Sequence, residues 1–358
     1  MSLKLEHITK SYGCIEAVKD VSFTSQGKHF IVLAGPSGCG KTTLLQLIAG
    51  FLKPDSGSIW IDDKEVQHAK PHERDIAMVF QDAALFPSMT VYDNIAYGLT
   101  YGGLSKQEAG QRVRAMAEVL GIDGLLKRKA EALSNGQKQR VSIARALVRR
   151  PKLFLMDEAF SALDTRLKAQ LRLELAKLYQ QLDATFLYVT HDRLEAMTLA
   201  DTLIVMKEGV FQQIGDPLKL YRDPANLFVA AFLGTYEINT LQAYVDGNIL
   251  TFEKECIKLS NTYEAQEVIM AIRPEHLIFS KEGMRGRIVL VEHLGDECYI
   301  RLVWQDQLFY MKVDRKVNIQ LYDEVCFRFE PKEILLFDKT SEQRCLVNRQ
   351  WERKCRSM

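Results

Sequence analysis

The chain has 358 residues, with 47 Lys and Arg against 46 Asp and Glu, and a formal net charge of +1. This balance excludes a strong overall field for nucleic acid or anionic lipid, and the length is typical of two domains. The longest apolar runs fall short of the roughly 20 residues that a spanning helix needs, the first residues lack a signal-peptide core, and seven cysteines without C-x-x-C spacing favour a reducing compartment. We therefore expect a cytosolic protein that reaches a membrane only through a partner.

The first predicted elements are strands that lead into a glycine-rich loop. Residues 1–34 are expected to form antiparallel strands at 3–5 and 17–23 and the strand 30–34, and residues 58–61 add another. The loop, GPSGCGKTT at 35–43, fits the pattern G-x-x-x-x-G-K-[ST] and precedes an amphipathic run at 44–49. Strand, glycine loop and helix form the context that this phosphate-binding motif requires.

Each residue type in this loop suits a nucleoside triphosphate. Glycines let backbone N–H groups turn toward phosphate oxygens, and the helix N-terminus adds partial positive charge. Lys41 is expected to reach the β- and γ-phosphates, and the Thr42 hydroxyl to bind Mg²⁺. Cys39 is expected to favour the thiolate beside Lys41, unless it points away from the nucleotide. The candidate contacts are Gly35, Pro36, Ser37, Gly38, Cys39, Gly40, Lys41, Thr42 and Thr43.

A helical region is predicted at about residues 88–150. Ser105 and Glu108 form a capping box before a helix whose apolar face holds Val113, Met116, Ala117 and Leu120. A second helix is expected from Ser134 to about residue 149, stopped before Pro151.

Two acids follow the next predicted strand, 153–156. Ligands of parallel sheets lie at the carboxyl ends of the strands, so Asp157 and Glu158 are expected to face the phosphates. Asp157 suits the Mg²⁺ shell, and Glu158 suits activation of the attacking water; a solvated acid pair is the alternative. A helix opening at Asp164 and a strand at 185–190 come next.

The segment LSNGQKQR at 133–140 resembles the L-S-G-G-Q signature of ABC ATPases. Further matches follow the order of that family: Tyr12, which would stack on adenine; Gln81, in the Q-loop; SALD at 161–164, the D-loop; and His191, the switch histidine. Taken singly, Tyr12 could be an ordinary half-exposed aromatic, Gln81 a surface glutamine, and His191 a capped or solvated histidine. Their order relative to the glycine loop is what identifies the family.

The resemblance implies an α/β P-loop ATPase domain, ATP with Mg²⁺, and a composite site between two copies or between this chain and a paralogue. Lys41, Thr42 and Glu158 of one copy would face Ser134 and Gly136 of the other. The implied catalytic residues are Glu158, His191 and Lys41. The implied Mg²⁺ ligands are Thr42, Gln81 and Asp157, and the implied nucleotide contacts beyond the loop are Tyr12, Gln81, Ser134, Gly136 and Gln137.

Two residues depart from the family pattern. Asn135 replaces the first glycine of the signature, and we expect it to tolerate positive φ there; its effect on turnover stays open. Ala159 replaces the usual proline after the acids and is expected to relax the turn without moving a ligand.

Beyond Gly234, short alternating segments predict a small β-barrel. RPEH at 273–276 resembles the OB-like, TOBE-like accessory barrel of maltose-type and glycerol-phosphate-type importer ATPases. No repeated basic and aromatic interleaving supports nucleic-acid binding. We expect an ATPase domain at 1–234, with the helical subdomain at about 88–150, and a barrel domain at 235–358 ending in a frayed or dimer-covered tail at 339–358. The expected strands are 268–272, 287–291, 298–303, 308–313, 325–329 and 334–337.

The resemblance implies the ATP-hydrolysing subunit of a bacterial ABC importer at the cytoplasmic face of the membrane. Its partners would be a second ATPase subunit, a permease docking near residues 81–94 and, indirectly, a solute-binding protein, with no nucleic acid. A carbohydrate or related solute is expected; importers of polyamine, iron or sulfate, a detached exporter ATPase, and a soluble ABC ATPase acting on DNA or ribosomes are the alternatives. The solute itself cannot be read from this chain.

Overall fold

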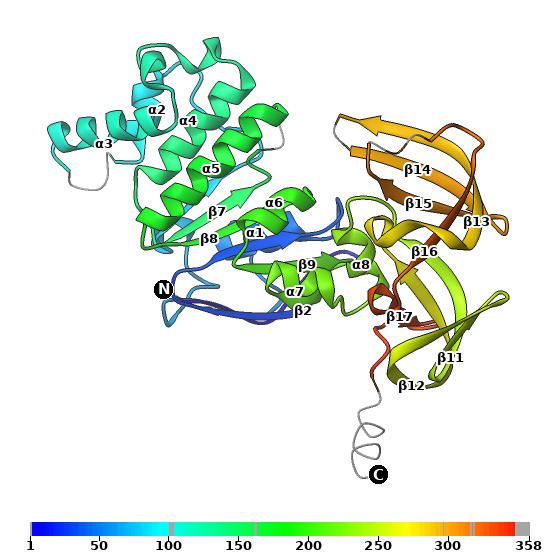
Figure 1. The fold of residues 1–358 in the computed structure, drawn as a ribbon. Coiled ribbons are helices and arrows are strands. Elements are labelled where there is room, and N and C mark those ends of the chain that lie inside the picture. The colour runs from blue at the N-terminus through cyan, green and yellow to red at the C-terminus, as the bar shows by residue number, and fades with distance from the viewer. Residues whose placement is uncertain are drawn as a thin grey trace. The chain divides into compact units, whose positions relative to one another are not determined.

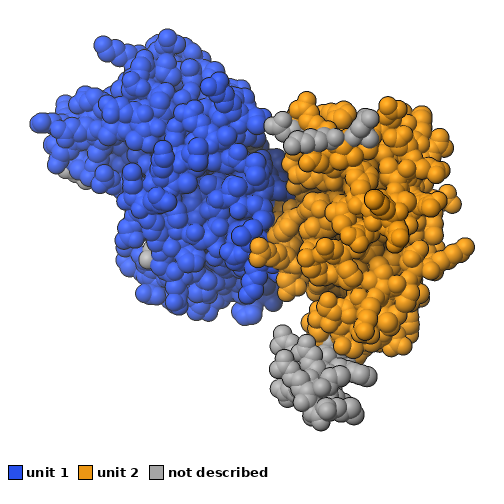
Figure 2. Space-filling view, viewed as in Figure 1, with its two compact units in different colours: residues 1–220 blue, residues 221–358 orange. Residues whose placement is uncertain are grey.

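A computed structural model describes residues 2–99, 104–160, 163–295, 297–315, 317 and 319–347. The chain forms two compact units, residues 1–220 and 221–358 (Figure 2). Helix α8 (Leu227–Leu233) precedes the domain boundary expected from the sequence, and it packs within the second unit through Ala230 against Ala271 and Phe337. The D-loop positions 161 and 162, and the tail from 348 onward, lie outside the described residues.

The first unit opens with a four-stranded antiparallel sheet in the order β2-β1-β4-β5. Alternating side chains of its strands, such as Leu3 and Leu5, are buried in the core, which confirms the strands expected around 3–5, 17–23 and 58–61. The strands are β1 (Ser2–Tyr12), β2 (Ile15–Gln26), β4 (Ser56–Ile61) and β5 (Lys64–Glu65).

A six-stranded sheet, β10-β9-β3-β8-β7-β6, carries the glycine loop. The antiparallel pairing expected for 30–34 is wrong, because β3 (Phe30–Ala34) runs parallel between β8 (Thr185–Thr190) and β9 (Thr202–Lys207). All five β3 residues are buried apolar residues, as a strand covered on both faces requires. β6 (Ile76–Val79) and β7 (Leu153–Asp157) extend the parallel part, and β10 (Val210–Gly215) is an antiparallel edge strand.

Two helices of the first unit begin at the caps that the sequence predicts, whereas α1 has no side-chain cap. Ser105 and Glu108 form the expected capping box of α3, and Asp164 caps α5. Figure 1 shows α2, α3 and α4 gathered beyond one edge of the sheet, which confirms the helical region. No helix among the described residues is long and apolar enough to cross a membrane. The helices are α1 (Lys41–Ala49), α2 (Val91–Tyr97), α3 (Lys106–Val119), α4 (Asn135–Leu147), α5 (Thr165–Gln181), α6 (Arg193–Leu199) and α7 (Pro217–Arg222).

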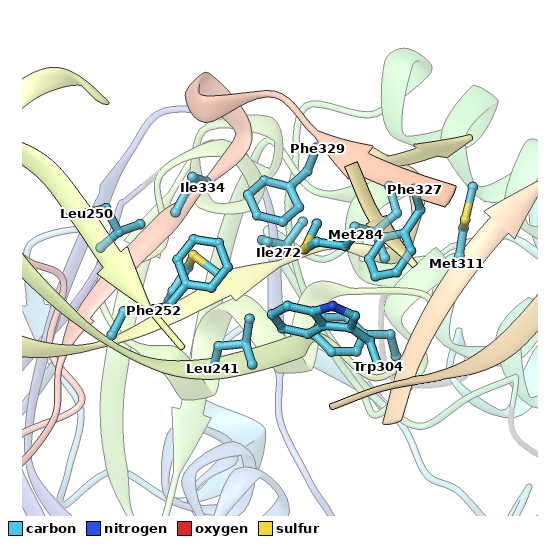
Figure 3. Packing of buried hydrophobic residues seen from close by; sticks show 14 of the residues in the cluster. Leu241, Leu250, Phe252, Ile272, Met284, Trp304, Met311, Phe327, Phe329 and Ile334 are labelled. Carbon is cyan, nitrogen blue, oxygen red and sulfur yellow. The ribbon is translucent and has the colours of Figure 1, made fainter. Parts of the chain in front are cut away.

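The second unit is built from two antiparallel sheets, β11-β12-β17 and β15-β14-β13-β16. Their inner faces share one apolar core that includes Leu241, Phe252 and Trp304 (Figure 3). All six expected strands are present, most of them longer than predicted, whereas β11 was not predicted. The strands are β11 (Asn239–Phe252), β12 (Glu255–Ile272), β13 (Leu277–Leu294), β14 (Glu297–Trp304), β15 (Gln307–Val313), β16 (Glu324–Phe329) and β17 (Leu335–Asp338).

Candidate nucleotide site

The glycine loop connects the end of β3 to the start of α1, and two of its glycines cannot be replaced without a clash. A Cβ atom added to Gly35 would lie 2.2 Å from the Met206 carbonyl oxygen, and one added to Gly40 would lie 2.0 Å from the Ala17 carbonyl oxygen. Gly40 also has a φ of 104°, a left-handed conformation that favours glycine. The loop therefore lies directly against neighbouring backbone, while Ser37 and Gly38 at its crest are exposed.

Lys41 lies inside the loop. Its side chain is 4% exposed, and its ammonium group donates hydrogen bonds to the carbonyl oxygens of Gly35 at 3.0 Å and Pro36 at 2.8 Å. The cation is thus held by carbonyl oxygens of the loop itself, and its contact with the β- and γ-phosphates stays a prediction.

Cys39 does not have the thiolate character expected from the sequence. It is 5% exposed, and its Sγ lies 3.9 Å from the Lys41 ammonium nitrogen. Burial raises the pKa of the Cys39 thiol and outweighs the opposite effect of Lys41. The expectation of a favoured thiolate is therefore wrong, because the loop removes this sulfur from water more effectively than the ammonium stabilises its charge.

Thr42 and Asp157 come together at the junction of α1 and β7. The Thr42 hydroxyl donates to the Asp157 carboxylate at 3.1 Å. Burial raises the pKa of Asp157, and the neighbouring Glu158 charge raises it further, whereas Thr42 and Lys41 lower it. A divalent cation would offset the cost of ionising this buried carboxyl group. The hydroxyl and carboxylate oxygens are ligands that Mg²⁺ prefers. The part of the chain that the structure describes contains no group of three or more His, Cys, Asp or Glu side chains that could hold a metal ion by themselves.

Glu158 and His191 also meet, although 33 positions of sequence separate them. His191 Nδ1 lies 3.1 Å from a carboxylate oxygen of Glu158. Glu158 has a φ of 43°, and its N–H donates to the Val189 carbonyl oxygen of β8 at 3.0 Å. The ends of β7 and β8 therefore place an acid and an imidazole side by side, beside the Thr42–Asp157 pair.

Gln81 follows β6 and lines a cavity of about 300 Å³ that also involves α4. Asn135, Lys138 and Gln139 of α4 line the same cavity, and the buried Gln139 amide donates to the Phe80 carbonyl oxygen at 3.3 Å. The segment that follows β6 and helix α4 are therefore in direct contact within the chain.

The signature segment forms the N-terminal end of α4. Ser134 is its N-cap: its hydroxyl accepts from the Gln137 N–H at 3.3 Å, and its own N–H donates to the Gln137 side chain at 3.1 Å. Asn135 is the first helical residue, so the expected need for positive φ at this position is wrong. Packing favours glycine at position 136, since a Cβ atom added to Gly136 would lie 3.1 Å from a Leu167 side-chain carbon.

Tyr12 lies at the end of β1, opposite Ile15, and is 48% exposed. Its ring stacks under the Lys10 ammonium group, 5.9 Å from the ring centroid. Stacking of Tyr12 on adenine stays a prediction.

Glu195 was not singled out from the sequence. Its carboxylate is 2% exposed and accepts hydrogen bonds from the hydroxyls of Tyr188 at 2.5 Å and Thr190 at 2.6 Å. Thr190 directly precedes His191, so this buried acid lies beneath the candidate site. An acidic residue in an amphipathic helix is ordinarily exposed, and no local pattern distinguishes Glu195 from its neighbours.

Comparison with known proteins covers both units. The ABC transporter family matches residues 18–161, and the TOBE domain family matches residues 270–337. The trehalose/maltose import ATP-binding protein MalK of Thermococcus litoralis is 42% identical over 364 residues, covering 95% of this chain and 98% of the relative. The sn-glycerol-3-phosphate import ATP-binding protein UgpC of Escherichia coli is 40% identical over 353 residues, covering 96% and 99%.

Solved structures agree with these matches. The structure of cbiO1 from Clostridium perfringens, part of the ABC transporter complex cbiONQ, superimposes with a TM-score of 0.57 at 31% identity, covering 62% of this chain and 90% of that chain. The dimeric structure of MJ0796, a bacterial ABC transporter cassette, gives a TM-score of 0.56 at 30% identity, covering 60% and 98%. With a P-loop, a signature helix and relatives that match it almost from end to end, the chain belongs to the ABC transporter ATP-binding proteins and is an ATPase that carries a C-terminal TOBE domain.

Proposed function

We propose that this chain is the ATP-hydrolysing subunit of a carbohydrate importer and works as a head-to-tail dimer on a membrane permease, at the cytoplasmic face of the membrane. The observation that carries the solute class is the set of relatives that match nearly the whole chain. These relatives are named for import of trehalose and maltose and of sn-glycerol-3-phosphate. A third relative, LacK of Rhizobium radiobacter, is 39% identical and is named for transport of lactose. These three names mention no import of polyamine, iron or sulfate and no work on DNA or ribosomes.

Mg²⁺ would be held by Thr42 and Asp157, with Gln81 as the third protein group, and would neutralise charge on the β- and γ-phosphates. Lys41 would exchange its bonds to the Gly35 and Pro36 carbonyls for bonds to phosphate oxygens. This exchange suits a buried ammonium group, because the phosphates supply charge that the carbonyls lack.

Hydrolysis would be performed by Glu158 and His191. Glu158 would orient the attacking water and accept its proton as the water oxygen bonds to the γ-phosphorus and the bond to the bridging oxygen breaks, giving ADP and phosphate. His191, 3.1 Å from the Glu158 carboxylate, would fix the orientation of that carboxylate. The strained φ of Glu158 supports such a role, because strain of this kind concentrates at functional sites.

Two copies would be needed for each complete site. The N-terminal end of α4, with Ser134, Gly136 and Gln137, offers the partial positive charge of the helix dipole to a γ-phosphate bound on the other copy. The N–H groups of Ser134 and Gln137 are already bonded within the capping box. The chain has one glycine loop and one signature segment, and the relative MJ0796 is a dimeric ABC transporter cassette. The permease would dock near residues 81–94, where Phe86 is 38% exposed beside Tyr97.

Mixing two inactive variants tests the composite site. Lys41→Ala and Ser134→Arg should each abolish turnover as homodimers. In a mixed dimer, one site combines an intact Lys41 with the partner's intact Ser134, and the other carries both lesions. With random assortment about half of the dimers are mixed, so turnover should return to about one quarter of wild type if the sites are independent. No recovery, with mixed dimers demonstrated, would refute the head-to-tail arrangement.

The solute class needs a separate measurement. Cells lacking this chain should lose uptake of a labelled sugar or sugar phosphate, and the wild-type chain should restore it whereas Lys41→Ala should not. Loss of polyamine, iron or sulfate uptake, with sugar uptake intact, would reject the carbohydrate proposal.

A further inference from the structure

A buried carboxylate lies directly beneath the turn that carries His191. Glu195, in the first turn of α6, is 2% exposed and accepts the hydroxyl hydrogens of Tyr188 and Thr190 on one oxygen, Oε2. Tyr188 and Thr190 belong to β8 and are themselves buried. An acid so well enclosed is unusual, and the structure gives it two hydroxyl donors from one strand.

The hydrogen bonds continue from Glu195 into the His191 turn. The Thr190 hydroxyl oxygen, while donating to Glu195, accepts the N–H of Asp192 at 3.0 Å. Asp192 in turn caps α6 through bonds from the N–H groups of Leu194 at 2.8 Å and Glu195 at 3.2 Å. A closed ring of hydrogen bonds thus runs from Glu195 through Thr190 and Asp192 back to the first turn of α6. His191 lies between Thr190 and Asp192 in the sequence, so both of its neighbours belong to this ring.

The chemistry of the carboxylate gives this path a direction. An ionised carboxylate only accepts hydrogen bonds, so the single hydrogen of the Thr190 hydroxyl must point toward Glu195. That leaves the hydroxyl lone pairs for the Asp192 N–H and fixes the backbone on both sides of His191. Bonds to a charged acceptor are also shorter and stronger than neutral ones, which agrees with the distances of 2.5 and 2.6 Å.

We infer that Glu195 is a positioning residue for ATP hydrolysis: through Thr190 and Asp192 it holds the His191 turn so that the imidazole meets Glu158. The inference rests on the roles proposed above for His191 and Glu158. The Tyr188 hydroxyl does not position His191. It donates to the same Glu195 oxygen, Oε2, but Tyr188 lies on β8, away from the turn. Burial raises the pKa of Tyr188 well above its ordinary value, and the Glu195 charge raises it further, so this phenol stays a donor.

A conservative series at Thr190 tests the inference in the purified full-length chain. Thr190→Val keeps the shape but removes both bonds of the hydroxyl, whereas Thr190→Ser keeps them. We expect Thr190→Val to lower kcat for phosphate release about tenfold or more while the ATP dissociation constant changes less than about twofold, because misplacement of a catalytic group affects the chemical step most. Thr190→Ser should restore kcat to within about twofold of wild type.

Tyr188→Phe separates positioning from packing. It removes the other hydroxyl from Glu195, so it should lower the melting temperature while leaving kcat within about twofold of wild type. An equal loss of kcat in Tyr188→Phe and Thr190→Val, or a Thr190→Val chain with normal kcat, would overturn the inference.

His191→Ala distinguishes failure of this inference from failure of the proposed function. If His191→Ala stops hydrolysis but Thr190→Val does not, His191 keeps its role and only the positioning by Glu195 is rejected. If His191→Ala turns over normally, both the positioning and the proposed role of His191 fail. Glu195→Gln, provided that it melts cooperatively, should resemble Thr190→Val, since an amide brings hydrogens to a site that already holds two donors.

Discussion

Arg74 donates hydrogen bonds to the C-terminal turn of α1, the helix that begins in the glycine loop. We expect replacement of Arg74 by alanine to destabilise the first unit. Its guanidinium is buried at 3% exposure and donates to the carbonyl oxygens of Leu47 and Ile48, both at 2.8 Å, and of Ala69 at 3.0 Å. The last carbonyls of a helix have no partner within the helix. A cation also suits the negative end of the helix dipole.

The size of the effect follows from these three bonds. A hydrogen bond that involves a charged group contributes about 1.5–3 kcal/mol, and the cost of burying the guanidinium offsets part of that sum. Burial lowers the pKa of Arg74, but an arginine stays protonated in proteins. We therefore expect Arg74→Ala to lower the free energy of unfolding by about 2–4 kcal/mol, which for a unit of this size lowers the melting temperature by roughly 5–15 °C.

Differential scanning calorimetry of the full-length chain, with and without ATP, measures this shift. Arg74→Lys should fall between Ala and wild type, because an ammonium group keeps the charge but cannot span the same three carbonyls. Arg114→Ala, on the exposed face of α3, is a matched control that should change the melting temperature little. A shift below about 2 °C for Arg74→Ala would refute the importance given to these bonds.

Three further outcomes are expected. Glu158→Gln should retain ATP but lose about 10²-fold in phosphate release, the scale of a missing general base; near-normal turnover would reject the role of Glu158. Cys39 should react slowly with a maleimide at neutral pH and faster as the pH rises. The pKa of Cys39 is raised in the folded chain. The contribution of Cys39 to stability is therefore complete below the ordinary thiol pKa and is lost as the pH rises through the folded pKa. Rapid labelling of Cys39 at pH 7 would contradict the raised pKa. Asn135→Gly should leave kcat within about twofold, because the position is helical, and a large gain in phosphate release would contradict that reading.

Elements that depend on neighbouring residues could be predicted from the sequence. The capping boxes at Ser105 and Ser134 and the cap at Asp164 all join groups three residues apart, so the pattern alone specifies them. The glycine loop is equally local, and its placement of Lys41 follows from the strand before it and the helix after it. The carboxyl end of β7 was located because a buried strand ending in acids is a short and recognisable pattern.

Other partners that are distant in sequence were not predicted. The apolar run of β3 predicts a buried strand but not its neighbours, so the parallel pairing with β8 and β9 was missed. β11 was missed because Asp246, Gly247 and Asn248 look like a turn, whereas the structure absorbs them as an irregularity in a long hairpin. Arg74 and Glu195 resemble surface charges until the fold supplies their buried partners.

The backbone of Glu158 is held by a hydrogen bond that does not involve the following residue, Ala159. Proline restricts the conformation of the residue before it, and a left-handed φ costs a residue other than glycine about 1–3 kcal/mol. Glu158 nevertheless has a φ of 43°, and the bond from its N–H to the Val189 carbonyl at 3.0 Å holds it there. That bond comes from β8 and not from residue 159, and Ala159 is buried at 1% exposure. Since β8 also delivers His191, the strand that fixes the acid's backbone also places its imidazole partner, and a proline after the acid is not needed to bring the two together.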